Sequence, residues 1–248
     1  MTSLQLSDEE YYSILETFKN SNNKEECVVL SCGPSLKLFK DREIREFCKN
    51  KFVISIKMAY LLYRNITDTV MINACNLPYS ESGEYYNFDT FSIVSSCFPK
   101  NVLIPNQKCD LFLQVTNPFE QNLDKNSFLS VTQDFEENKL SNTLLRKCYP
   151  GIMGESCIPF IEYMGFKKFT TIGWDLVNSN VTIENYKHFW DGMNMKMSNK
   201  ANPGAIPYDN ILNIEASGPL NDWLASKDIE WNIAGNSALS QTIKRVSI

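Results

Sequence analysis

The sequence predicts an α/β fold, with one Rossmann-like domain built on a doubly wound, mostly parallel sheet. Three observations support this prediction. The 248 residues are 43% hydrophobic, which is enough to bury one large core without forcing a second domain. Short apolar runs alternate with helical or polar segments along the chain. Some of these runs stop abruptly at glycine-containing turns, as buried parallel strands do.

The chain is expected to begin with a helix, within an N-terminal segment 1–25 that packs outside the sheet. Ser7 and Glu10 have the spacing of a capping box, and the helix should run to about Lys19. Seven strands then follow from the apolar runs at 27–31, 52–56, 69–73, 91–96, 110–115, 169–173 and 229–234.

A second helix is predicted from about Glu155 to Met164, closed by Gly165. Residues 178–210 are polar, contain Pro-Gly and follow a strand end, so they are predicted to form an irregular lid over an active site. No internal repeat or linker interrupts 1–248, which is therefore expected to be a single domain.

Composition excludes several classes of protein. The 24 basic and 29 acidic residues give a net charge of -5 without a basic cluster, which argues against a nucleic-acid partner. The N-terminus lacks the pattern of a signal peptide, and no apolar stretch approaches the roughly 20 residues that span a bilayer. A cytoplasmic protein without a transmembrane segment is expected, and a homo-oligomer is compatible with this composition.

The eight cysteines show no CxxC pair and no histidine at zinc-binding spacing. They are expected to be reduced and mostly buried rather than paired in disulfides, and no structural metal is implied.

Candidate chemistry lies where the predicted strands end, because ligands of open parallel sheets bind outside the carboxyl ends of the strands. The turn Cys32-Gly33-Pro34-Ser35 offers close backbone approach and a hydroxyl, although a purely structural turn reads the same way. Gly154 lies at the start of the second helix, where free N–H groups suit a phosphate, or where glycine permits close packing on the sheet.

The strand 169–173 ends in Gly173-Trp174-Asp175. A carboxylate at this position can accept hydrogen bonds from a ribose or base, from the Cys32–Ser35 turn, or from the N-terminus of a helix. His188 is the only histidine in the chain and lies within the predicted lid, so any imidazole base must be this residue. An isolated surface histidine is the competing interpretation.

Three blocks of the sequence together resemble the bacterial lipooligosaccharide sialyltransferase family, which uses CMP-sialic acid as its donor. The block 28–37 is similar to that family's first strand and its G-P-S-L-K turn. The block 153–175 is similar to its glycine, helix, strand and G-x-D block, with the same spacing between glycines, and 229–237 resembles its closing strand and N-S turn.

This resemblance implies transfer of a sialic-acid-like or related keto sugar from a CMP-activated donor to a glycan hydroxyl, as in glycan biosynthesis. It implies no obligatory cofactor, although Mg²⁺ is compatible. The implied catalytic candidates are His188, Asp209 and Tyr186. The implied nucleotide-binding residues are Cys32, Gly33, Ser35, Asn73, Met153, Gly154, Gly173 and Asp175.

The chain also departs from the family pattern. Cys32 and Lys57 each stand where the family has asparagine, and Met153 stands where it has serine or threonine. The family's catalytic histidine and two tyrosines have no direct counterparts, which leaves the choice between His188 and Asp209 as base open. A looser similarity to motility accessory factors and archaeal pterin diphosphokinases keeps a Mg²⁺-dependent ATP diphosphokinase open, as well as a non-catalytic nucleotide-binding relative.

Overall fold

The computed structural model describes residues 8–73, 88–96, 109–114, 135–137, 139–140, 151–176 and 205–248. The elements in these ranges are α1 (Asp8–Glu16), β1 (Cys27–Leu30), η2 (Pro34–Lys37), α2 (Asp41–Cys48), β2 (Phe52–Ile56), α3 (Ala59–Tyr63), η3 (Arg64–Ile66), β3 (Thr69–Asn73), β4 (Phe91–Ser96), β5 (Leu111–Gln114), η7 (Met153–Cys157), α5 (Ile158–Tyr163), β6 (Lys168–Ile172), α6 (Ala205–Ser226), β7 (Glu230–Ala234), η8 (Ala238–Gln241) and β8 (Lys244–Arg245).

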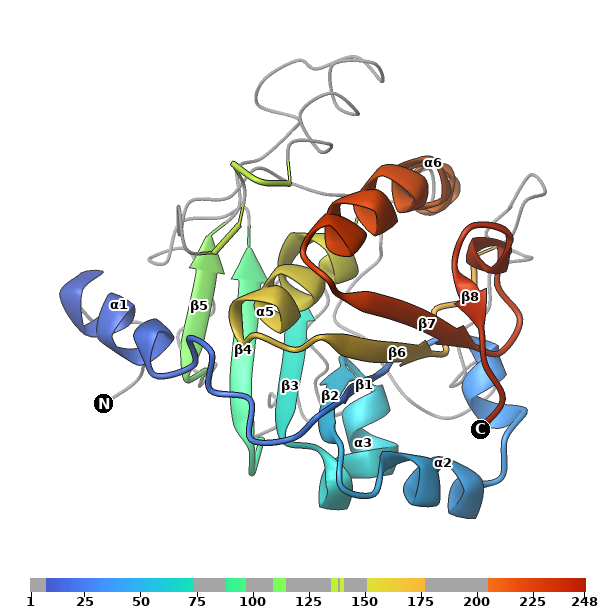
Figure 1. The fold of residues 1–248 in the computed structure, drawn as a ribbon. Helices are drawn as coiled ribbons and strands as arrows, with labels where there is room; N and C mark the ends of the chain where they lie inside the picture. The colour runs from blue at the N-terminus through green and yellow to red at the C-terminus, as the bar shows by residue number, and fades with distance from the viewer. Residues whose placement is uncertain are drawn as a thin grey trace.

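The strands form one sheet in the order β5-β4-β3-β2-β1-β6-β7-β8, and all neighbours are parallel (Figure 1). From β1 the chain moves strand by strand to one edge of the sheet. It then returns to β6 on the other side of β1 and continues to the opposite edge. The doubly wound α/β fold predicted from the sequence is confirmed.

Helices cover both faces of this sheet, with α5 and α6 on one face and α2 and α3 on the other (Figure 1). The alternation of side chains along β1 separates the two layers. Cys27 and Val29 join the core cluster beneath α5 and α6, whereas Val28 and Leu30 join the cluster beneath α2 and α3. Every residue of β1 is therefore buried, which explains its uninterrupted apolar sequence.

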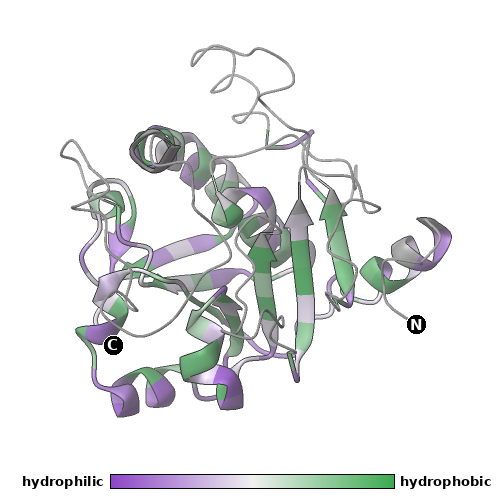
Figure 2. Ribbon diagram, turned by 180° about the vertical axis from the view of Figure 1, so that it is seen from behind, coloured by the Kyte–Doolittle hydropathy of each residue, from purple (hydrophilic) through white to green (hydrophobic). Residues whose placement is uncertain are grey.

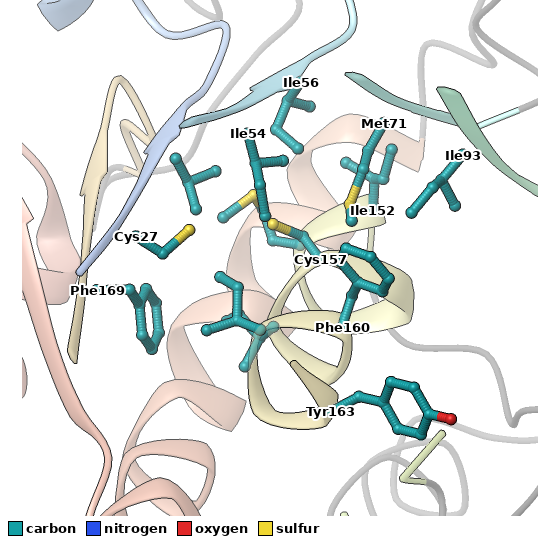
Figure 3. Packing of buried hydrophobic residues seen from close by; sticks show 14 of the residues in the cluster. Cys27, Ile54, Ile56, Met71, Ile93, Ile152, Cys157, Phe160, Tyr163 and Phe169 are labelled. Carbon is teal, nitrogen blue, oxygen red and sulfur yellow. The ribbon is translucent and has the colours of Figure 1, made fainter. Parts of the chain in front are cut away.

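The larger core lies between the sheet and α5. Cys157 and Phe160 of the helical segment face Ile54 and Met71 of the strands, as Figure 3 shows. In Figure 2, β4 and β5 are mostly hydrophobic, whereas β6 and β7 include hydrophilic residues and α2 carries both colours. In α2 the residues Ile44 and Cys48, one turn apart, are its buried pair.

The seven predicted strands are all present, each within one residue of its expected bounds at either end. The structure adds β8, which is only two residues long and exposed. The first helix ends at Glu16, three residues before the predicted end, because the chain turns there and Asn20 donates its backbone N–H to the Tyr163 carbonyl.

The predicted irregular lid is wrong at its carboxyl end. Residues 205–210 belong to α6, a helix that continues to Ser226 with Pro219 in its interior. The Pro-Gly pair at 203–204 thus precedes the helix start, and the apolar residues further along α6 stabilise it by packing on the sheet: Leu212, Ala216, Leu220 and Leu224 are buried. The remainder of the predicted lid lies outside the described residues.

Candidate functional site

The winding of the sheet reverses between β1 and β6. These strands are hydrogen-bonded neighbours, with Leu30 opposite Ile172 in the register, yet β2, β3, β4 and β5 lie between them in the described sequence. The loops after β1 and β6 therefore leave the sheet side by side at its carboxyl edge. In open α/β sheets this reversal is where ligands bind.

The two loops are joined by backbone hydrogen bonds beyond the ends of the strands. The N–H of Ser31 donates to the Ile172 carbonyl at 2.7 Å, and the N–H of Gly33 donates to the Gly173 carbonyl at 2.6 Å. A Cβ on Gly33 would lie 2.6 Å from that carbonyl oxygen and 2.4 Å from Asp175 Oδ2. Glycine is thus required at position 33 because the backbone there lies against the loop after β6 of the same protein.

Asp175 joins the same loops through its side chain. Its Oδ2 accepts the backbone N–H of Ser35 at 2.5 Å, and its Oδ1 accepts the Ser35 hydroxyl. Burial raises the pKa of Asp175, and the two hydrogen bonds from Ser35 oppose that rise. The sequence allowed three kinds of hydrogen-bond partner for Asp175: a ligand, the Cys32–Ser35 turn or a helix N-terminus. The structure shows hydrogen bonds from the Cys32–Ser35 turn.

The loop after β7 completes the junction. A Cβ on Gly235, which has φ +103°, would lie 2.5 Å from the Ser35 hydroxyl oxygen. The Ser237 hydroxyl accepts the N–H of Leu176 at 3.2 Å, and the N–H of Ala238 donates to the Leu176 carbonyl at 2.7 Å. The three sequence blocks 28–37, 153–175 and 229–237 therefore each contribute a loop or a strand end to one point of the sheet.

Cys32 does not present its thiol at the surface. Its side chain is buried, and Sγ donates to the Ile56 carbonyl at the end of β2 at 3.1 Å. Burial raises the pKa of Cys32 to about 11, although the positive charge of Lys57 opposes the rise. The thiol is thus a packed, protonated group rather than a nucleophile.

The predicted phosphate-binding helix starts with a π-helical turn, η7. Met153 is buried in the hydrophobic core, and Gly154 is also buried. Glu155, only 8% exposed, lies in this first turn, with Oε2 at 3.4 Å from the Ser95 hydroxyl of β4. The first turn of this helix therefore already contains an acidic residue, in the part of a helix where negative charge is favoured.

Lys57, which departs from the asparagine of the family pattern, directly follows β2 at the carboxyl ends of the strands. Its backbone has φ +49°, and its N–H donates to the Met71 carbonyl of β3 at 2.9 Å. No feature of the sequence signals this conformation, because left-handed backbone is typical of glycine, asparagine and aspartate rather than of lysine.

The remaining candidates are placed only in part. Asn73 is the last residue of β3 and Asp209 lies in α6, and the structure describes their backbone only. Tyr186 and His188 lie outside the described residues. The structure therefore brings together Cys32, Gly33, Ser35, Gly173 and Asp175.

Within the described residues, no group of three or more His, Cys, Asp or Glu side chains could hold a metal ion. The five cysteines in these ranges are free and buried, as expected from the sequence. No helix in the described part of the chain is long and apolar enough to cross a membrane. No protein-family model matches this chain, and no curated protein matches it.

Proposed function

We propose that this protein is a nucleotide-dependent glycosyltransferase, which moves a sialic-acid-like or related keto sugar from a CMP-activated donor to a glycan hydroxyl. One observation carries the proposal. The loops after β1, β6 and β7 converge where the winding of the sheet reverses, and each of them belongs to one of the three blocks that resemble the sialyltransferase family.

In the proposed reaction a base removes the proton of the acceptor hydroxyl while CMP departs from the donor sugar. His188 and Asp209 are the two candidates for the base, and Tyr186, two residues before His188, is the candidate proton donor to the departing phosphate. A departing monophosphate needs positive charge or N–H groups near it. The N-terminus of the helix at Gly154 could supply such N–H groups. It is less suited to a phosphate than a helix without an acidic first turn, because Glu155 lies in its first turn.

A second function, nucleotide binding without turnover, is favoured by a different observation. The polar groups of the converging loops are largely bound to one another: Ser35 to Asp175, Cys32 to Ile56, and Ser237 to Leu176. A relative that has lost catalysis would keep such a junction as structure. It would bind a nucleotide and release no product.

The first test is thermal stabilisation of the protein by CMP, CDP, UDP, ADP and ATP, each with and without Mg²⁺. A ligand that binds only the folded state stabilises it by about 2.7 kcal/mol at a hundred times its Kd. Stabilisation by CMP regardless of Mg²⁺ supports the glycosyltransferase. Stabilisation only by ATP with Mg²⁺ supports the diphosphokinase, and the absence of any shift contradicts a nucleotide site.

Release of CMP from a CMP-activated sugar then separates the transferase from the binding protein. The variants His188→Ala and Asp209→Ala identify the base. Loss of release in one of them, with CMP stabilisation retained, assigns catalysis to that residue. Unchanged release in both variants would show that neither is the base.

A further inference from the structure

The backbone of Lys57 is exceptional among the described residues. Four residues other than glycine have positive φ there: Asn20, Asn50, Lys57 and Asp228. Three of them are asparagine or aspartate, whose short polar side chains form local hydrogen bonds that tolerate this conformation. Lysine has no such compensation, so the surrounding structure must hold this conformation, and residues held in this way are concentrated at functional sites.

The side chain of Lys57 also differs in its ion pairing from the lysines at the amino ends of the strands. There Lys24 pairs with Asp68, and both Lys51 and Lys168 pair with Glu26. Lys57 as a whole residue is only partly exposed, and its side chain has no ion pair or hydrogen bond to any other described residue. Among the described residues, Lys57 is therefore a lysine without a charged partner directly after β2, at the carboxyl ends of the strands.

The surroundings of Lys57 belong to the candidate site. β2 lies beside β1, and the Cys32 thiol of the β1 loop is bonded to Ile56, the residue before Lys57. The charge of Lys57 is close enough to act on that thiol. It is therefore a cation next to the loop at which the winding of the sheet reverses.

We infer that Lys57 binds the phosphate of the nucleotide, in place of the helix whose first turn contains Glu155. This inference rests on the proposed function, because it assigns one group of the same site. An ammonium next to the loop after β1 attracts an anionic phosphate, whereas the first turn of that helix already contains the acidic residue Glu155. The ligand class is a nucleoside phosphate, and the nucleoside alone gains nothing from Lys57.

The test compares CMP with cytidine by isothermal titration calorimetry, in wild type and in Lys57→Asn, which accepts the same backbone and removes the charge. We expect Lys57→Asn to bind CMP at least roughly tenfold more weakly, with the affinity for cytidine unchanged. Lys57→Arg should retain most of the affinity for CMP. Lys57→Gly should lose it while the protein unfolds at the same or a higher temperature, since glycine removes the backbone strain.

Asn50→Gly is the matched control. Asn50 also has positive φ, but it precedes β2 and so lies at the amino ends of the strands, away from the candidate site. It should leave CMP binding unchanged. Equal binding of CMP by wild type and Lys57→Asn would overturn the role of Lys57 and leave the nucleotide site standing. An equal loss for CMP and cytidine would also overturn it, since that pattern reports a distorted site. If wild type binds none of the nucleotides, both the inference and the proposed function fail.

Discussion

The carboxylate of Asp175 holds the loop after β1 against the loop after β6. It accepts two hydrogen bonds from one residue, Ser35, which is only 2% exposed. A buried N–H that loses its acceptor costs more than the bond itself contributes, because water cannot replace the acceptor. The Asp175 side chain is therefore a structural requirement of the site, whether or not it also touches a ligand.

Asp175→Ala should lower the free energy of unfolding by about 2 kcal/mol, because the Ser35 N–H and hydroxyl both lose their acceptor. Urea unfolding followed by circular dichroism measures the change. Ser35→Ala is the control, since it removes only the hydroxyl bond and should cost about 1 kcal/mol. An unchanged midpoint in Asp175→Ala would show that the junction contributes nothing to stability.

Among the turns, Gly173 and Gly151 separate two effects of replacing glycine. Both have left-handed backbone, with φ +78° and +81°. A Cβ on Gly173 would lie 2.9 Å from the Ser31 carbonyl oxygen, whereas one on Gly151 would lie no closer than 3.9 Å to the nearest group. Gly151→Ala therefore reports backbone strain alone, and Gly173→Ala adds the clash between the β1 and β6 loops.

Gly151→Ala should cost about 1 kcal/mol and Gly173→Ala about 2–4 kcal/mol, since overpacking adds to the strain. Thermal unfolding of the two variants measures the difference. Equal losses would mean that the β1 loop moves away from a Cβ at position 173 without cost.

The strands were predictable because they are buried on both faces. A run such as Val28 to Leu30 contacts one helical layer and then the other, so each position must be apolar and the pattern is continuous. β8 was not predictable, because its two residues, Lys244 and Arg245, are exposed and charged. The π-helical turn at Met153–Cys157 also has no sequence signal of its own.

The candidate site was predictable only in outline. The Gly-Pro-Ser and Gly-x-Asp turns indicated where the strands end, and β1–β6 pairing brings them together. Sequence could not show that Asp175 is bound by Ser35, since that choice depends on which loop comes within hydrogen-bonding distance. It also gave no indication that Glu155 is buried in the first turn of its helix or that Lys57 has left-handed backbone.

At the scale of the whole molecule, Glu26 links the two sides of the sheet, on either side of β1, at the amino ends of the strands. It precedes β1 and pairs with Lys51 before β2 and with Lys168 at the start of β6. Burial raises the pKa of Glu26, but the hydrogen bonds and charges of Lys168 and Lys51 outweigh it and hold the pKa below its usual range. The ionised carboxylate is therefore more favourable in the folded protein than in the unfolded chain.

Because the pKa of Glu26 is lower when folded, its stabilisation is present above pH 4.5 and is lost as the pH falls through the folded value. Glu26→Gln should lower the free energy of unfolding at pH 7 by about 1 kcal/mol. The difference from wild type should shrink toward zero in acid. Urea unfolding at pH 7, 5 and 3 measures it, and Glu46→Gln, whose pair with Lys49 is exposed, is the control and should be about as stable as wild type at pH 7.

The return of the chain to β6 also bears on how the protein is made. β1 ends at Leu30, and its second neighbour ends only at Ile172, 142 residues later. At a translation rate of about 5–20 residues per second, the ribosome needs roughly 7–28 s to make that interval. Throughout this time one side of an entirely apolar strand lacks its partner, which is the kind of edge that recruits other chains. The β6 side of β1 is therefore an unpaired, apolar strand edge in the nascent chain until residue 172 has been synthesised.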